Sequence, residues 1–128
     1  MNLLLDSHAF VWMHEQPHKL SFKIASEILD PANQIFLSAA SVWELQIKIT
    51  LGKFKFNDKF ENVIAQERQT NELRILPVNL AHALYLENLP LHHKDPFDRL
   101  LISQAIVENM ILVSNDSKFS AYPVNLWW

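Results

Sequence analysis

Short apolar runs alternate along the chain with longer segments in which apolar residues recur every three or four positions. The runs predict strands and the periodic segments predict helices. Asn2–Leu5 is a short run of this kind that stops at Asp6, typical of a strand covered on both faces of a parallel sheet. The other predicted strands are residues 34–37, 73–78 and 110–113, with residues 124–127 as an edge strand.

Helices are predicted between these strands. The clearest covers residues 95–108, where Asp95 can cap the helix and Pro96 takes its first position. A second covers residues 38–51 and ends at Gly52, a typical helix-terminating residue. Further helices are expected at residues 20–29, 57–69 and 80–86, with a helical turn at residues 116–119. Strands that alternate with helices predict a three-layer α/β/α sandwich around a central, largely parallel sheet.

Composition narrows the possible chemistry. A length of 128 residues, 49% apolar and 20% charged, predicts one folded domain over residues 1–128. The lack of cysteine excludes disulfides, thiolate zinc sites and cysteine nucleophiles, and a single glycine excludes glycine-rich phosphate-binding loops. No segment has the apolar length of a membrane span and no signal peptide is visible at the N-terminus. A soluble, cytoplasmic protein without a membrane partner is therefore expected.

Acidic residues follow the predicted strands. Because ligands of open parallel sheets bind beyond the carboxyl ends of the strands, these acids are expected to face one crevice. They are Asp6, Glu44, Asp95, Asp98 and Asp116. Most have a structural alternative: Asp95 and Asp116 can cap helices, Asp98 suits a helix N-terminus, and Ser41 with Glu44 matches a capping box. Asp6 has no such role unless a helix begins directly after it.

Several carboxylates in one crevice need a cation. Two carboxylates 4 Å apart repel by about 4 kcal/mol at an effective dielectric constant of 20. Oxygen ligands with few histidines suit Mg²⁺ or Mn²⁺, ions that support phosphodiester hydrolysis by water. Lys48, Lys53 and Lys55 could contact phosphates, although a solvated helix face explains them equally well. With four of the 14 acids bound to metal, the net charge of −3 no longer argues against a nucleic-acid substrate.

The histidines give a weaker signal. His8 lies two residues after Asp6 and could approach a substrate, or could be a partly buried spacer. His92 and His93 stand in a loop that looks exposed and offers no third ligand at a fitting spacing, so no zinc site is predicted there. The rings of Trp43, Trp127 and Trp128 are expected in the core or an interface rather than stacked on bases.

Four motifs in order resemble the PIN-domain family, most closely its small VapC-like toxins. They are Asp6-Ser7-His8 after LLL, SAASVWELQIK from Ser38, LPLHHKDPFDRLLISQA from Leu89, and VSND ending at Asp116. The resemblance implies a Mg²⁺- or Mn²⁺-dependent endoribonuclease, an antitoxin partner and a homodimer. Its catalytic and metal-binding acids would be Asp6, Glu44, Asp98 and Asp116. Residues expected beside these ligands or the substrate are Ser7, where the family often has Thr, His8, Asp95, Arg99, Ser114 and Asn115.

The sequence leaves two questions open: which aspartate of DPFDR is the ligand, and whether the chain is a nuclease. DPFDR contains Asp95 and Asp98, and helix geometry favours Asp98 as the ligand because Asp95 takes the capping position. A catalytically silent PIN-like module that binds RNA or protein would keep the same acids as caps. Metal-dependent RNA cleavage that a chelator abolishes distinguishes the nuclease from this module. A phosphatase with Asp6 as nucleophile is less favoured, because His8 stands where its second aspartate is expected.

Overall fold

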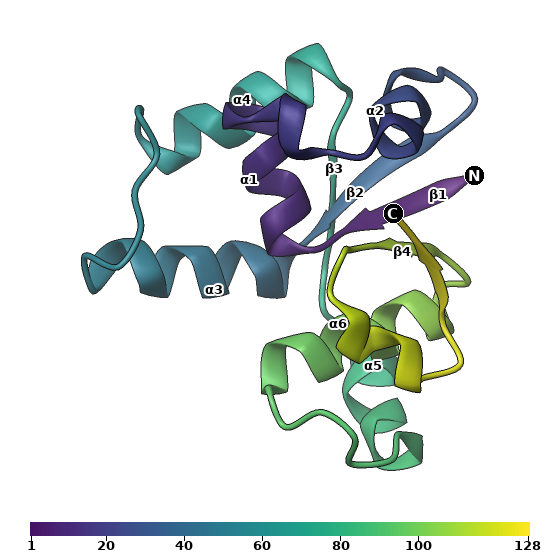
Figure 1. Ribbon diagram of the computed structural model, residues 1–128. Helices are drawn as coiled ribbons and strands as arrows, with labels where there is room; N and C mark the ends of the chain where they lie inside the picture. The colour runs from purple at the N-terminus through teal and green to yellow at the C-terminus, as the bar shows by residue number, and fades with distance from the viewer.

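The computed structural model describes residues 1–128 and contains one five-stranded sheet (Figure 1). Its strand order is β3-β2-β1-β4-β5, and every neighbouring pair is parallel. The strands are β1 (Asn2–Leu5), β2 (Gln34–Ser38), β3 (Arg74–Leu76), β4 (Ile111–Val113) and β5 (Asn125–Trp127). All five predicted strands are present, and β3 ends at the residue before Pro77, which lacks the N–H that a sheet needs.

Six α-helices and three short 3₁₀ helices connect or follow the strands. The α-helices are α1 (Ser7–Glu15), α2 (Phe22–Leu29), α3 (Ala39–Thr50), α4 (Phe60–Thr70), α5 (Leu80–Tyr85) and α6 (Pro96–Val107). The 3₁₀ helices are η1 (Pro17–Lys19), η2 (Leu86–Asn88) and η3 (Ser117–Ala121). None of the helices combines the length and apolar character needed to cross a bilayer.

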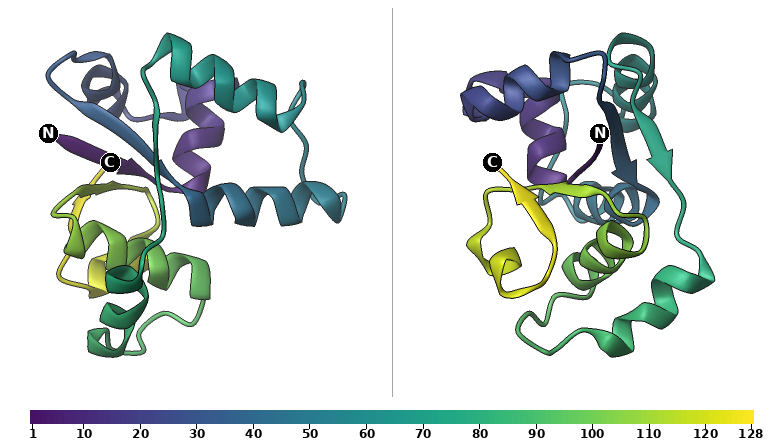
Figure 2. Two further views of the ribbon diagram at one scale, coloured as in Figure 1. Left: turned by 180° about the vertical axis from the view of Figure 1, so that it is seen from behind. Right: turned by 90° about the vertical axis from the view of Figure 1, so that its right-hand side faces the viewer.

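The sheet separates two apolar cores, which confirms the predicted three-layer sandwich. Leu3 and Leu5 of β1 point into one core with α1, α2, α3 and α4, whereas Leu4 points into the other with α6. Successive side chains of a strand alternate between its faces, so one wholly apolar strand supplies both cores. Figure 2 shows the two groups of helices on opposite sides of the strands.

Helix α1 was not predicted, and it begins directly after β1. Asp6 is its N-cap: the Asp6 Oδ1 accepts the backbone N–H of Ala9 at 2.7 Å. The helix contains the aromatic residues Phe10 and Trp12 and the β-branched Val11, whose intrinsic helix propensity is low. It is stabilised instead by burial of Ala9, Phe10 and Met13 against the sheet. Asp6 thus meets the one condition under which a capping role was expected, since a helix begins directly after it.

Both ends of helix α3 have identifiable capping interactions. Ser41 and Glu44 do not form the capping box considered as a structural alternative for Glu44, because the helix begins before Ser41 and Ser38 caps it through the N–H of Ala40 at 3.0 Å. Gly52 does terminate the helix, with a φ of +71°. Gly52 and Lys53 donate to the carbonyls of Ile49 and Lys48, which completes a Schellman motif.

The topology places the site. The chain begins in the central strand β1, builds the sheet on one side through β2 and β3, and then crosses to β4 and β5 on the other side. Loops diverge where the order reverses, beyond the carboxyl ends of β1 and β4, and such a point is the usual ligand site of an open α/β sheet. Asp6 follows β1 there, and Ser114 follows β4.

Candidate metal centre

A small cleft of about 120 Å³ opens at this point and gathers five acids. Asp6 follows β1, Glu44 comes from α3, Asp95 and Asp98 come from the start of α6, and Asp116 precedes η3. Its remaining lining residues are Ser7, His8, Lys48 and Phe119. Residues more than 100 positions apart in the sequence thus share one cavity, and its volume holds several water molecules.

Three of these acids cap helices with one oxygen only. Besides Asp6, the Asp95 Oδ1 accepts the N–H groups of Phe97 and Asp98, and the Asp116 Oδ1 accepts the N–H of Lys118. A carboxylate has two oxygens, so in each case the Oδ2 atom makes no capping bond. Capping and metal binding are therefore compatible, and the capping role does not argue against a site.

Two serine hydroxyl groups form hydrogen bonds to acids of the cleft. Ser7 Oγ donates to Glu44 Oε1 at 2.6 Å and joins the start of α1 to α3. The buried Ser114 Oγ accepts the N–H of Asp116 at 3.0 Å, which leaves its proton to donate to Asp6. Both serines were expected beside the acids, and both contact them.

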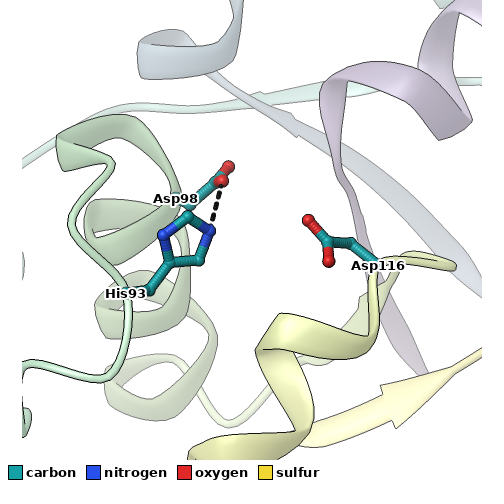
Figure 3. Close-up of side chains that lie close together, drawn as sticks. All are labelled: His93, Asp98 and Asp116. Atoms are coloured by element: carbon teal, nitrogen blue, oxygen red, sulfur yellow. Dashed lines mark ion pairs between the residues drawn. The ribbon is translucent and has the colours of Figure 1, made fainter.

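Asp98 has no capping bond and lies beside a histidine that the sequence did not assign to the site. His93 Nε2 is 2.9 Å from Asp98 Oδ2, and Asp116 faces both residues from the segment after β4 (Figure 3). One ligand atom from each of the three residues lies within 4.8 Å of the others. The view of His93 as an exposed loop residue is wrong, because its side chain is only 10% exposed. The sequence signal that could have placed His93 near the site is its position two residues before Asp95, the helix cap.

Burial and mutual repulsion raise the pKa of two carboxyl groups. Burial raises the pKa of Asp6, and neighbouring Asp116 adds to the rise, while hydrogen bonds from Ser114 and Ala9 and the nearby His8 oppose it. Burial, followed by the charge of Asp95, raises the pKa of Asp98 to about 6. Glu44 and Asp6 add to this rise, and His93 opposes it. The cleft therefore holds an excess of negative charge that a cation would relieve.

The donor set fits a hard divalent ion. Oxygen atoms of several carboxylates converge, and neither cysteine nor a converging group of histidines is present. Mg²⁺ and Mn²⁺ prefer such ligands. Asp6, Glu44, Asp98 and Asp116 could hold the ion, since each lines the cleft.

A larger groove of about 420 Å³ adjoins the acidic cleft. The two share Ser7, His8 and Lys48, and the groove continues along Val11, Trp12, Gln16, Leu45, Lys53 and Phe54. Of the three lysines expected to contact phosphates, Lys48 and Lys53 thus line a surface beside the acids, whereas Lys55 lies outside both cavities. No local sequence pattern marks this groove, because its apolar walls come from α1, α3 and the loop after α3.

Two expected neighbours of the site lie elsewhere. Arg99 does not line the cleft; its guanidinium donates to the carbonyls of Leu86, Leu89 and Pro90 at 2.9–3.3 Å. It therefore fixes the loop before α6. Asn115 is exposed and also lies outside the cleft. Trp43, expected in the core or an interface, is 64% exposed and packs edge-on against Phe97.

The chain is similar to known proteins in both sequence and structure. The family model of the PIN domain matches residues 3–125. Among curated proteins, none matches the chain significantly. Among solved structures, VapBC2 from Rickettsia felis, bound to a DNA fragment from their promoter, is 25% identical with a TM-score of 0.74, over 99% of this chain and 98% of that chain.

More distant structures share the fold. DNA-bound VapBC from Salmonella typhimurium has a TM-score of 0.70 at 15% identity, covering 99% of this chain and 97% of that one. FitAcB from Neisseria gonorrhoeae has a TM-score of 0.65 at 19% identity, covering 98% and 96%.

Proposed function

The chain belongs to the PIN domain family, and we propose that it is a metal-dependent endoribonuclease, the toxin of a toxin–antitoxin pair. PIN domains are generally nucleases, which supports hydrolysis of nucleic acid as the type of activity. One observation supports it above all: acids from four separate parts of the chain converge in one small cleft at the topological switch point.

The expected cofactor is Mg²⁺ or Mn²⁺, held by Asp6, Glu44, Asp98 and Asp116. When bound, such an ion orients a phosphodiester, lowers the pKa of a water molecule and offsets charge on the leaving oxygen. The protein residues would hold the ligands in place: Ser7 orients Glu44, and Ser114 together with the Ala9 amide orients Asp6. Lys48, which lines both the cleft and the adjoining groove, would attract the RNA phosphate next to the acids.

A protein partner is the second part of the proposal. Several of the structures similar to this chain are toxin–antitoxin complexes. We infer that an antitoxin lays an apolar segment along the groove walled by Val11, Trp12, Leu45 and Phe54 and sends an Arg or Lys toward the acids. A guanidinium would satisfy the carboxylates in place of metal. Weaker binding of the antitoxin to Asp6→Asn or Asp98→Asn would support this geometry, and unchanged affinity would place the inhibitory contact elsewhere.

A homodimer in the cytoplasm is the remaining expectation. Sedimentation analysis of the purified protein tests the oligomeric state. A short reading frame that encodes a DNA-binding protein directly upstream would support the toxin assignment.

Metal binding and RNA cleavage test the central proposal. Ions that bind only the folded protein add RT ln(1 + [L]/Kd) to its stability, about 2.7 kcal/mol at one hundred times Kd. We therefore expect Mn²⁺ and Mg²⁺ to raise the melting temperature and to support cleavage of single-stranded RNA that EDTA abolishes. Ca²⁺ should bind but support less cleavage. Absence of both a melting shift and a calorimetric signal with millimolar Mn²⁺ would remove the metal site and favour the silent binding module.

A further inference from the structure

His93 is a buried histidine with an unusual set of neighbours. Its side chain is nine-tenths buried, and its Nε2 atom has no solvent exposure and no well-aligned hydrogen-bond partner. The nearest acceptor is Asp98 Oδ2, at hydrogen-bonding distance but off the direction of the N–H bond. Nε2 therefore points into the acidic cluster with one carboxylate in reach (Figure 3).

The other ring nitrogen fixes which atom carries the proton. The backbone N–H of Asp95 donates to His93 Nδ1 at 3.2 Å, so Nδ1 presents its lone pair. The proton of the neutral ring must then be on Nε2. A histidine that ligates a metal through Nε2 has the opposite arrangement, with its Nδ1–H donating to a second group. His93 is thus arranged as a donor to Asp98 and not as a metal ligand.

The surrounding loop keeps the ring in this position. The backbone N–H of His93 donates to the Tyr122 hydroxyl at 2.8 Å, and that hydroxyl donates to the Pro90 carbonyl at 2.8 Å. The ring also packs beside Phe119, a buried residue that lines the cleft. These contacts, together with the bonds of Arg99 to the loop carbonyls, restrict the loop and hence the imidazole.

We propose that His93 is a positioning residue of the metal centre, whose Nε2–H holds one oxygen of Asp98 and leaves the other oriented toward the cleft. This inference rests on the proposed metal-binding function of the acids. Hydrogen bonds of this kind are often poorly aligned in the ligand-free protein and tighten when the ligand binds. Loss of a group that orients a metal ligand typically weakens metal affinity by about 10- to 100-fold.

Calorimetric titration with Mn²⁺ and with Mg²⁺ tests the proposal on four proteins: wild type, His93→Leu, His93→Gln and His92→Leu. His93→Leu should weaken Mn²⁺ binding by about tenfold or more. His93→Gln retains an N–H donor and should bind within about threefold of wild type. His92→Leu is the matched control, because His92 is exposed in the same loop and contacts Tyr122 rather than the acids.

Each other outcome has a defined meaning. Unchanged binding by His93→Leu overturns the positioning role. Equal losses in the Gln and Leu variants, larger for Mn²⁺ than for Mg²⁺, would instead make His93 a nitrogen ligand. Wild-type Mn²⁺ affinity in Asp98→Asn and Asp116→Asn would overturn the proposed function itself, which none of the His93 results does.

A measurement on the wild-type protein does not depend on whether the variants fold. Nitrogen-15 NMR of the imidazole rings should show His93 protonated at Nε2 and unprotonated at Nδ1, with Mn²⁺ omitted. The reverse tautomer would overturn the proposal.

Discussion

Helix α6 has a histidine–carboxylate pair at each end. At its C-terminal end, His82 Nε2 lies 2.8 Å from Glu108, and at its N-terminal end, His93 Nε2 lies 2.9 Å from Asp98. In both pairs Nδ1 accepts a backbone N–H, so Nε2 faces the carboxylate. The two rings thus have the same tautomer, although only the His82–Glu108 contact is a well-aligned hydrogen bond.

Their surroundings differ. His82 is fully buried, and Ser103 and Gln104 of α6 hydrogen-bond its carbonyl and its ring, so this pair joins α5 to the core. Asp98 instead shares a cleft with Asp6, Glu44 and Asp95, and burial together with the charges of these acids raises its pKa. A histidine–carboxylate pair therefore stabilises the fold at one end of the helix, and belongs to a candidate site at the other because further acids converge there.

The largest expected effect is the loss of RNA cleavage when the carboxylate at the N-terminal end of α6 is replaced. Asp98→Asn should reduce metal-dependent RNA cleavage by about 100-fold or more, because a ligand worth several kcal/mol of transition-state stabilisation is lost. Asp6→Asn, Glu44→Gln and Asp116→Asn should behave similarly. The metal-free melting temperature should stay equal or rise, since one repelling charge disappears.

Glu108→Gln is the control for Asp98→Asn. It removes the same charge from the same helix but keeps an acceptor for His82, so cleavage should stay at the wild-type level. An active Asp98→Asn beside an inactive Asp95→Ala would contradict the choice of Asp98 as the ligand.

The next largest effect is a loss of stability when the His82–Glu108 pair is removed. His82→Leu removes the acceptor of the Asn79 N–H and the donor to Glu108, which should lower the free energy of unfolding by about 1–3 kcal/mol. Urea denaturation with EDTA present measures this change. Mn²⁺ affinity of the folded fraction should match that of wild type; a specific loss of Mn²⁺ binding would show that the two ends of α6 are coupled.

A smaller effect on stability is expected when the N-terminal cap of α6, Asp95, is removed. Asp95→Ala leaves the amides of Phe97 and Asp98 without their acceptor and should cost about 1 kcal/mol of stability. Cleavage should fall less than in Asp98→Asn, since Asp98 remains. Equal losses of cleavage in the two variants would indicate that Asp95 is itself a ligand.

The smallest effect is the pH dependence of the metal-free protein. An ordinary aspartate has a pKa of 3.8 and Asp98 has a pKa of about 6 in the folded protein, so between these values the folded protein holds a proton that the unfolded chain releases. Stability should therefore fall as the pH rises from about 4 to about 6. The raised pKa of Asp6 adds to the fall. Denaturation of Asp98→Asn should show a shallower dependence, and an identical curve would assign the effect to other groups.

Most of the fold could be predicted from the sequence. Apolar runs predicted all five strands, and Pro96 and Gly52 marked the start of α6 and the end of α3 because their backbone preferences act locally. The resemblance in four motifs likewise indicated four acids, and all of them line one cleft: Asp6, Glu44, Asp98 and Asp116. Their roles as ligands stay predictions.

Only the tertiary structure decided the rest. Helix α1 has weak intrinsic propensity and forms because Phe10 and Met13 are buried against the sheet, a contact that no local pattern reveals. His93 looked like an exposed loop residue because its neighbours Phe119 and Tyr122 follow it by more than 25 positions. Arg99 looked like a site residue, but its hydrogen bonds go to the preceding loop. Strand and cap signals depend on neighbours in the sequence, whereas the partners of a buried polar group are chosen by packing across the fold.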